Sequence, residues 1–170
     1  MTTTRDGPRR KQCLITMTRM LFVKIIDPHK RINMEVKRRH KGRGKCTLFS
    51  LCFFDDMSDD NRCHDSHGLI AEMFLRRRHN YVQAICSSQK WRSLATAVRG
   101  QACWTCMWLM RSADERKAAL NEFNGMYPMK IVEQFLEEAT RERFNFLFVN
   151  LLAPSREEAC FKNFEYRLLP

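Results

Sequence analysis

Nearly uninterrupted apolar runs of strand length recur along the chain. They predict strands at residues 47–54, 81–86, 103–109 and 146–152. The runs 81–86 and 103–109 are nearly continuous in apolar residues, which is typical of strands that are covered on both faces. We interpret 47–54 as a buried strand and 146–152 as a fourth strand.

Apolar side chains at helical spacing follow and separate these runs. Leu69, Ile70, Met73 and Phe74 fall on one face of a predicted helix, for which Asp65 or Ser66 is a candidate N-cap. Strands that alternate with helices at these lengths favour a layered α/β domain with a parallel or mixed sheet.

Two further helices have clear start signals. Ser112 and Glu115 have the spacing of a capping box, and Gly125 is the expected end of that helix. Pro128 suits the first turn of the next helix. The inward stripe of that helix consists of Ile131, Val132, Phe135, Leu136 and Ala139.

The charge of the chain is concentrated near its start. The 170 residues give room for one domain and carry a net charge of +11. Residues 1–45 hold 14 Lys and Arg against 3 Asp and Glu, whereas residues 46–170 hold 16 against 16. A basic N-terminal segment, residues 1–46, is therefore expected ahead of a neutral domain, with polyanions as its partners. Its candidate nucleic-acid contacts are Lys37, Arg38, Arg39, Lys41, Arg43 and Lys45. A nuclear-import signal and a solvated tail are the alternatives.

Composition and run length exclude several classes of protein. Hydrophobic residues make up 44% of the chain, as in globular and unlike disordered or fibrous proteins. No apolar run reaches the about 18 residues that span a bilayer, so we expect no membrane partner. The 8 Cys follow no export signal, because Arg19 and Lys24 interrupt the N-terminal apolar stretch. We therefore expect reduced thiols in a soluble, intracellular protein of the cytoplasm, nucleus or virion.

A carboxylate pair carries the main chemical signal. The apolar residues 51–54 end in Asp55 and Asp56, which fits the Walker B pattern of nucleoside triphosphatases. A buried strand fixes its carboxyl end at a ligand crevice. The first carboxylate can then hold the shell of a magnesium ion, and the second can orient or deprotonate water.

The order of the features downstream makes this pattern more specific. It comprises Phe74, Arg78, His79, the run 82–88, Gln89, Leu94, Val98, Arg99, Ala102 and Arg111. It continues with Phe135, Thr140, the run 146–151, Pro154, Phe161, Asn163 and Phe164. This order resembles the DNA-packaging ATPases of the FtsK/HerA superfamily, in the branch of poxviruses, giant viruses, virophages and Polinton-type transposons. In that branch an Arg-His pair precedes a strand that ends in Ser-Gln.

The resemblance implies a fold, cofactors and partners. It implies that residues 47–170 form a partial RecA-like core of the P-loop NTPase type, with a mostly parallel sheet. The implied cofactors are Mg²⁺ and ATP. The implied partners are double-stranded DNA, a viral capsid and further copies of the chain in a ring.

The resemblance also implies roles for individual residues. Asp55 would bind the magnesium ion and the nucleotide, Asp56 would be catalytic, and Gln89 would sense the γ-phosphate. Arg99 and Arg111 match basic positions of the family pattern. Either would reach the nucleotide of a neighbouring subunit as an arginine finger, and we place Arg99 in the catalytic set. A structural salt bridge is the alternative for both.

A glycine-rich phosphate loop of the form G-x-x-x-x-G-K-[S/T] is missing from this sequence. The nearest segment, Gly44-Lys45-Cys46-Thr47, has Arg39 in place of the first glycine and Cys46 in place of the hydroxyl. It also runs directly into the Walker B strand, whereas a phosphate loop opens a helix. The chain therefore resembles the C-terminal part of an ATPase core, joined to a segment, residues 1–46, that is poorly ordered or unrelated to the family.

Three other clusters have structural interpretations. Cys103 and Cys106 have the spacing of a redox or zinc site. Strand residues three apart point to opposite faces, however, so we interpret both as buried strand cysteines. Arg76, Arg77 and Arg78 are expected at a helix end, with phosphate contact as the alternative. A polar loop is the interpretation of Asp59, Asp60, Cys63, His64, Asp65 and His67, although the last four could ligate a metal.

Two functions follow from these observations. The leading one is a partial or degenerate viral genome-packaging ATPase, inactive alone because nothing holds the triphosphate. The alternative is a non-catalytic nucleic-acid-binding protein that uses the basic segment.

Overall fold

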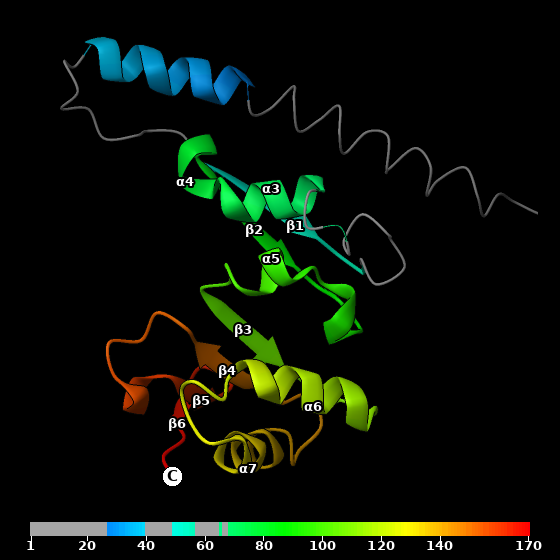
Figure 1. Cartoon of the computed structure of the whole chain (residues 1–170). Helices are drawn as coiled ribbons and strands as arrows, with labels where there is room; N and C mark the ends of the chain where they lie inside the picture. Colours follow the sequence, from blue (N-terminus) through cyan, green and yellow to red (C-terminus); the bar gives the residue numbers. More distant parts are fainter. Residues whose placement is uncertain (1–26, 40–48, 57–64, 66–67) are drawn as a thin grey trace, which may run out of the picture.

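The computed structural model describes residues 27–39, 49–56, 65 and 68–170. Figure 1 shows how their elements are arranged. Helices and strands alternate along the chain, which confirms the predicted α/β class. The strands form a parallel pair, β1 (Ser50–Phe54) and β2 (Val82–Cys86), and a separate four-stranded sheet in the order β3-β4-β5-β6.

The parallel pair is in register from Ser50 opposite Val82 to Phe54 opposite Cys86. A parallel pair needs a crossover connection, and helices α3 (Leu69–Leu75) and α4 (Arg77–Asn80) lie within it. Helix α5 (Thr96–Arg99) follows and contacts α3. The small core of this part consists of Phe54, Ile70, Ala71, Met73, Val82, Ala95 and Val98.

The four-stranded sheet is antiparallel throughout. Its strands are β3 (Trp104–Met107), β4 (Leu147–Asn150), β5 (Cys160–Lys162) and β6 (Tyr166–Arg167). The parallel element is therefore confined to β1 and β2, which differs from the mostly parallel sheet that the resemblance implied. Short connections join β4, β5 and β6, and such connections allow only antiparallel pairing.

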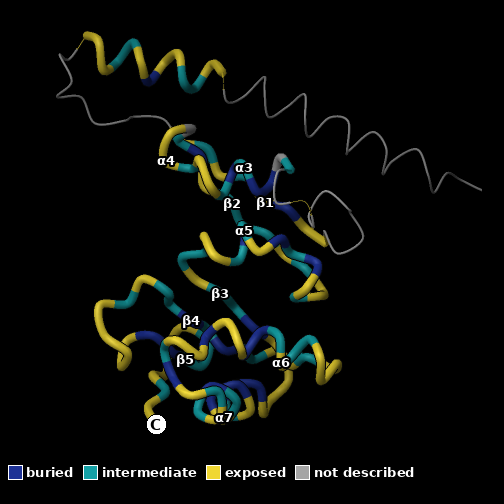
Figure 2. The backbone as a smooth tube through the Cα atoms, viewed as in Figure 1, coloured by how far each residue is buried: buried dark blue, intermediate teal, exposed yellow. Residues whose placement is uncertain are grey.

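Helices α6 (Ala113–Glu122) and α7 (Met129–Ala139) cover one face of the antiparallel sheet (Figure 1). The larger core lies between them and the sheet, and Figure 2 shows its buried residues in dark blue. Its largest fully buried side chains are Met107, Leu120, Leu136, Leu147, Val132 and Val149. The predicted stripe of α7 is confirmed by four buried members, with Ile131 half-buried.

The helix starts agree in part with the sequence. Ser112 caps α6 and accepts a hydrogen bond from the backbone N–H of Glu115, as predicted. The helix ends at Glu122, before Gly125, and Pro128 is the N-cap of α7 and not part of its first turn. Gly68 caps α3, so Asp65 does not, and Ser66 lies outside the described residues. No helix in the described ranges is long and apolar enough to cross a membrane.

Part of the basic segment is helical. Residues 27–39 form a helix that the sequence did not predict. The Nδ1 atom of His29 lies 3.2 Å from the hydroxyl of Ser50 in β1, and the ammonium of Lys37 lies 5.2 Å from the ring centre of Tyr81. The helix therefore contacts the start of both parallel strands.

Strand β1 is covered on one face only by the described elements. Phe49, Leu51 and Phe53 are each at least 60% exposed, whereas Phe54 belongs to the small core. The expectation of a buried strand was therefore wrong for the face of β1 that carries Phe49, Leu51 and Phe53. Its apolar run has the composition of a two-sided strand, but α3 and α5 pack on a single side.

Candidate functional site

The predicted site residues follow the two parallel strands. Asp55 and Asp56 come directly after β1, and Ser87, Ser88 and Gln89 come directly after β2. The backbone N–H of Ser87 donates to the carbonyl of Phe54 at 2.7 Å, so the pairing continues to the ends of the strands. Because the strands are parallel, both groups of residues lie at the same sheet edge.

Asp56 and Gln89 meet across this edge. The Nε2 of Gln89 donates a hydrogen bond of 3.0 Å to Oδ1 of Asp56, although the residues are 33 positions apart. Both side chains are exposed, so water can reach the pair. The amide oxygen of Gln89 can still accept a hydrogen bond while its nitrogen donates to Asp56. This pair can thus hold a water molecule between an acceptor carboxylate and an acceptor amide.

A backbone turn at Asp56 helps to place its carboxylate. Its φ angle is 49°, in the left-handed region that few residues other than glycine adopt. Asp and Asn are several-fold enriched there among the other residue types. A carboxylate or its isosteric amide is therefore better suited to this position than a branched side chain.

Serine hydroxyls fix the loop that carries Gln89. The hydroxyls of Ser88 and Ser93 lie 2.6 Å apart, and that of Ser93 donates to the carbonyl of Lys90 at 2.7 Å. Ser93 is buried in the short helix η2 (Trp91–Ser93). This role of Ser93 was not predicted, because no periodic pattern in the sequence marks it. The loop is rigid at both sides of Gln89 as a result.

The same loop is attached to helix α6. The backbone N–H of Arg92 donates to Oε2 of Glu115 at 2.9 Å. The ring of Trp91 packs on that of Phe123, with 5.8 Å between centroids. Ala95 belongs to the small core and Trp91 packs against the large one. The loop beside the candidate site therefore connects the two parts of the molecule.

The structure places Arg99 in a structural ion pair. Its guanidinium forms an ion pair with Glu122 and donates to the carbonyl of Leu94 at 3.0 Å and to the hydroxyl of Thr96 at 3.2 Å. Its side chain is only 16% exposed. Burial lowers the pKa of Arg99, and the carboxylate of Glu115 partly offsets this effect. These contacts fit the salt-bridge alternative, while Arg111 is exposed.

Asp55 is the exposed carboxylate at the end of β1. Within the described residues, no three His, Cys, Asp or Glu side chains are grouped so as to hold a metal ion. Mg²⁺ commonly binds through one or two carboxylates together with substrate phosphates and water. Asp55 thus fits an ion that arrives with a nucleotide and does not fit a site made of protein ligands alone.

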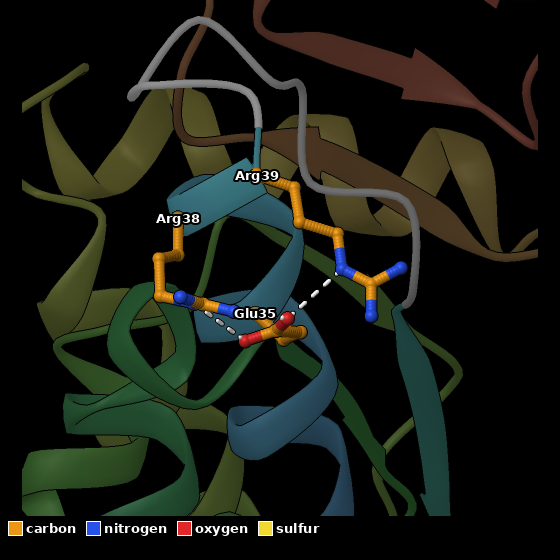
Figure 3. Close-up of polar contacts among 3 residues, drawn as sticks. All are labelled: Glu35, Arg38 and Arg39. Atoms are coloured by element: carbon orange, nitrogen blue, oxygen red, sulfur yellow. Dashed lines mark hydrogen bonds and ion pairs between the residues drawn. The ribbon is translucent and has the colours of Figure 1, made fainter.

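Three of the predicted nucleic-acid contacts lie on the helix of residues 27–39. Figure 3 shows the carboxylate of Glu35 between Arg38 and Arg39, with 2.9 Å from each Nε to the carboxylate. The hydrogen bond from Arg38, and then that from Arg39, lowers the pKa of Glu35 to about 2. All three side chains are solvent-accessible, so a phosphate that reached this helix would compete with Glu35 for the same guanidiniums. Lys41, Arg43 and Lys45 lie outside the described residues.

The cysteines behave as structural thiols. Burial raises the pKa of Cys86, Cys106 and Cys160 to about 11 in each case. Cys106 lies in β3, and Cys103 accepts a hydrogen bond from Arg77 just before that strand. Thiols of this kind are largely protonated at neutral pH and are weak ligands and nucleophiles.

Of the remaining predicted positions, the structure describes Arg76, Arg78 and Asp65. Arg76 forms an exposed ion pair with Glu72, and Arg78 is exposed. Asp65 is exposed, and its carbonyl accepts from the N–H of Gly68. The other members of the predicted polar loop lie outside the described residues, namely Asp59, Asp60, Cys63, His64 and His67.

Comparisons with known proteins give structural neighbours only. No family model matches the sequence, and a search of curated proteins gives no match. The chain is similar to solved structures of the genome packaging NTPase B204 from Sulfolobus turreted icosahedral virus 2. For the complex with ATP-gammaS the identity is 18% over 66% of this chain and 50% of that one. For the AMP complex the identity is 17%, and the match covers 81% of this chain and 61% of that one. For the AMPPCP complex the identity is 16%, and the match covers 85% of this chain and 63% of that one. The TM-score is 0.49 in each case, and this chain spans about half to under two thirds of the neighbour's length.

Proposed function

We propose, from the arrangement of its own side chains, that this chain is the water-positioning part of a nucleoside triphosphatase of the DNA-packaging type. The observation that carries the proposal is the hydrogen bond between Gln89 and Asp56 at the carboxyl edge of a parallel strand pair. The resemblance to the FtsK/HerA-type pattern pointed to these two residues, and the parallel pairing of β1 and β2 brings them to the same sheet edge.

The roles of the two residues follow from their chemistry. The Asp56 carboxylate would accept a hydrogen bond from the attacking water and draw off its proton as the bond from water to the γ-phosphorus forms and the bond from that phosphorus to the leaving oxygen of ADP breaks. The Gln89 amide donates to Asp56 and offers its oxygen to the same water, which fixes the direction of attack. A rigid loop from Ser88 to Ser93 keeps the amide in place.

Asp55 would hold Mg²⁺ together with the phosphates of ATP. The bound ion would neutralise charge on the transferred phosphoryl group. What the chain itself contributes is one exposed carboxylate, fixed at the end of β1. Double-stranded DNA, a capsid and a ring of copies are the partners that the family resemblance suggests.

The 170 residues contain no G-x-x-x-x-G-K-[S/T] loop, so this chain by itself should not turn over ATP. The second candidate function is a non-catalytic nucleic-acid-binding protein. The absence of the phosphate loop from this sequence favours it, and so does the basic segment, in which 14 Lys and Arg stand against 3 Asp and Glu. Magnesium-dependent ATP hydrolysis by the chain as it stands, abolished in Asp56→Asn, would contradict the expected inactivity.

The proposed site is tested in a fusion that supplies the missing part. A phosphate-loop segment of the packaging type is placed ahead of Thr47, and ATP binding and hydrolysis are measured separately. Asp56→Asn should slow hydrolysis at least about 100-fold while nucleotide binding persists, because a water-positioning group acts mainly in the transition state. Asn suits the left-handed backbone, so the fold is retained.

The matched control is Asp114→Asn, which removes an exposed carboxylate from the first turn of α6. It should hydrolyse ATP at the rate of the unchanged fusion. A fusion that binds and hydrolyses ATP and tolerates Asp56→Asn at full rate would show that the site is assigned wrongly.

A further inference from the structure

The face of the antiparallel sheet away from α6 and α7 is covered by aromatic rings. The strand register places Trp104, Phe148 and Phe161 on this face, opposite to the core residues Met107, Leu147 and Val149. We call the set the outer aromatic face. Its members are Trp104, Trp108, Phe146, Phe148, Phe161 and Phe164.

These six rings form one continuous cluster. Phe148 is in contact with Trp104 at 6.4 Å, Phe161 at 6.1 Å and Phe164 at 5.0 Å between centroids. Phe146 joins it to Trp108 and to Phe164, each at 5.1 Å. The inner rings are half-buried by their neighbours, whereas Trp104, Trp108 and Phe164 are 44%, 53% and 66% exposed. The three exposed rings therefore adjoin a set of half-buried rings that are already packed against one another.

The polar surroundings of this face suit a polyanion. At the outward positions of the four strands of this sheet there is no carboxylate and no aliphatic side chain. Those positions hold, besides the rings, Cys106, Asn150 and the exposed Arg167, which is paired with Phe161. The charge excess of the chain lies in residues 1–45, and residues 46–170 hold 16 basic against 16 acidic side chains, so the contact of this face with a phosphate backbone rests on the exposed guanidinium of Arg167.

We infer that the outer aromatic face binds single-stranded nucleic acid, with unpaired bases stacked on Trp104, Trp108 and Phe164. Exposed aromatic side chains on antiparallel sheets stack bases in this way in several folds, and an arginine nearby meets the backbone. The bases of a duplex are already stacked and paired, so this site discriminates against it. The inference is independent of ATP hydrolysis at Asp56 and Gln89.

The full chain offers a direct readout, because it has three tryptophans and two of them lie on this face. The third, Trp91, packs inside against Phe123. Tryptophan emission is titrated with a thymidine oligonucleotide, an abasic oligonucleotide of the same length and a duplex. About 0.5 M salt limits binding by the basic segment, since charges are screened within several ångströms and phosphate contacts weaken steeply. The thymidine strand should quench emission, and the abasic strand and the duplex should not.

Variants separate stacking from general apolar contact. Phe164→Leu keeps an apolar side chain but removes the flat ring, and it should weaken binding of the thymidine strand by about 5- to 150-fold, as expected for the loss of one stacked base. Phe164→Tyr should retain the affinity of the unchanged chain. Phe53→Leu is the matched control, because it removes an equally exposed ring on the separate strand β1.

The alternative occupants give different results. Equal quenching by the abasic strand, or full affinity in Phe164→Leu, would overturn the inference. Emission that shifts with protein concentration alone, together with a dimer in sedimentation, would assign the face to a second copy of the chain. Absence of quenching by any strand would also overturn it.

Discussion

The guanidinium of Arg99 is held by three protein acceptors, and this set of contacts predicts a loss of stability when the side chain is removed. Arg99→Met should lower the free energy of unfolding by about 2 kcal/mol, because Glu122 is left without its charged partner in a partly buried place. Urea denaturation measures the change. Arg111→Met, at an exposed position, should have an effect within about 0.5 kcal/mol.

If Arg99 were an arginine finger, its replacement would change the rate of hydrolysis and not mainly the stability. In the fusion with a phosphate loop, replacing a finger would lower the rate of hydrolysis with little effect on stability. A stable Arg99→Met variant with a large loss of rate would therefore contradict the structural role.

At the scale of single residues, the sequence predicted the two side chains that meet at the candidate site, but it did not predict the contacts that hold the neighbouring loop. Asp56 and Gln89 could be found because each closely follows an apolar run, and parallel strands bring such ends together. The contacts of Arg99 and Ser93 could not be found, because they depend on a turn and on the packing of η2 against α6. Such contacts have no periodic signal in the sequence.

At the scale of elements, the start of α6 predicts a measurable capping energy. The hydroxyl of Ser112 accepts from the N–H of Glu115, and Ser112→Ala should lower the free energy of unfolding by about 1 kcal/mol. Ser155→Ala is the matched control, since Ser155 precedes η3 (Arg156–Glu158) without a side-chain capping bond. Denaturation of both variants checks the difference, and an equal effect of the two would refute the capping role.

The elements with strong local signals were predicted, and those that depend on tertiary pairing were not. The stripe of α7 and the cap of α6 are local and were confirmed. The hairpin of β5 and β6 has strands of three and two residues, which are too short to show a period. The apolar runs at β1 and β3 suggested burial, but an apolar residue has the same signal whether its face is covered or exposed, and Leu51, Phe53 and Trp104 are exposed.

At the scale of the whole molecule, the basic segment predicts salt-dependent binding to double-stranded DNA. Replacing Lys37, Arg38, Arg39, Lys41, Arg43 and Lys45 by Gln should reduce the slope of log affinity against log salt by about 0.9 for each phosphate that is no longer neutralised. Affinity measured at several salt concentrations gives this slope. An unchanged slope would show that the segment does not contact DNA.

Glu35→Gln tests the same contacts in the opposite direction, because it should strengthen DNA binding. It removes the carboxylate that Arg38 and Arg39 share, so both guanidiniums become available and affinity should rise. Because its pKa is lowered to about 2, Glu35 stays ionised and keeps this pairing at all pH values used for DNA binding. The pairing disappears only as the pH falls through about 2. Reduced affinity of Glu35→Gln would contradict the competition between Glu35 and phosphate.

The measurement that tests the central claim most directly is a double-mutant cycle between Asp56 and Gln89. Hydrolysis by the fusion with a phosphate loop is measured for Asp56→Asn, Gln89→Ala and the double variant. If the two side chains hold one water molecule together, the double variant should be no slower than Asp56→Asn alone, because once the carboxylate that takes the proton is lost, the positioning of that water by Gln89 no longer adds to the rate. Two independent effects that multiply, or full activity in Asp56→Asn, would contradict the account.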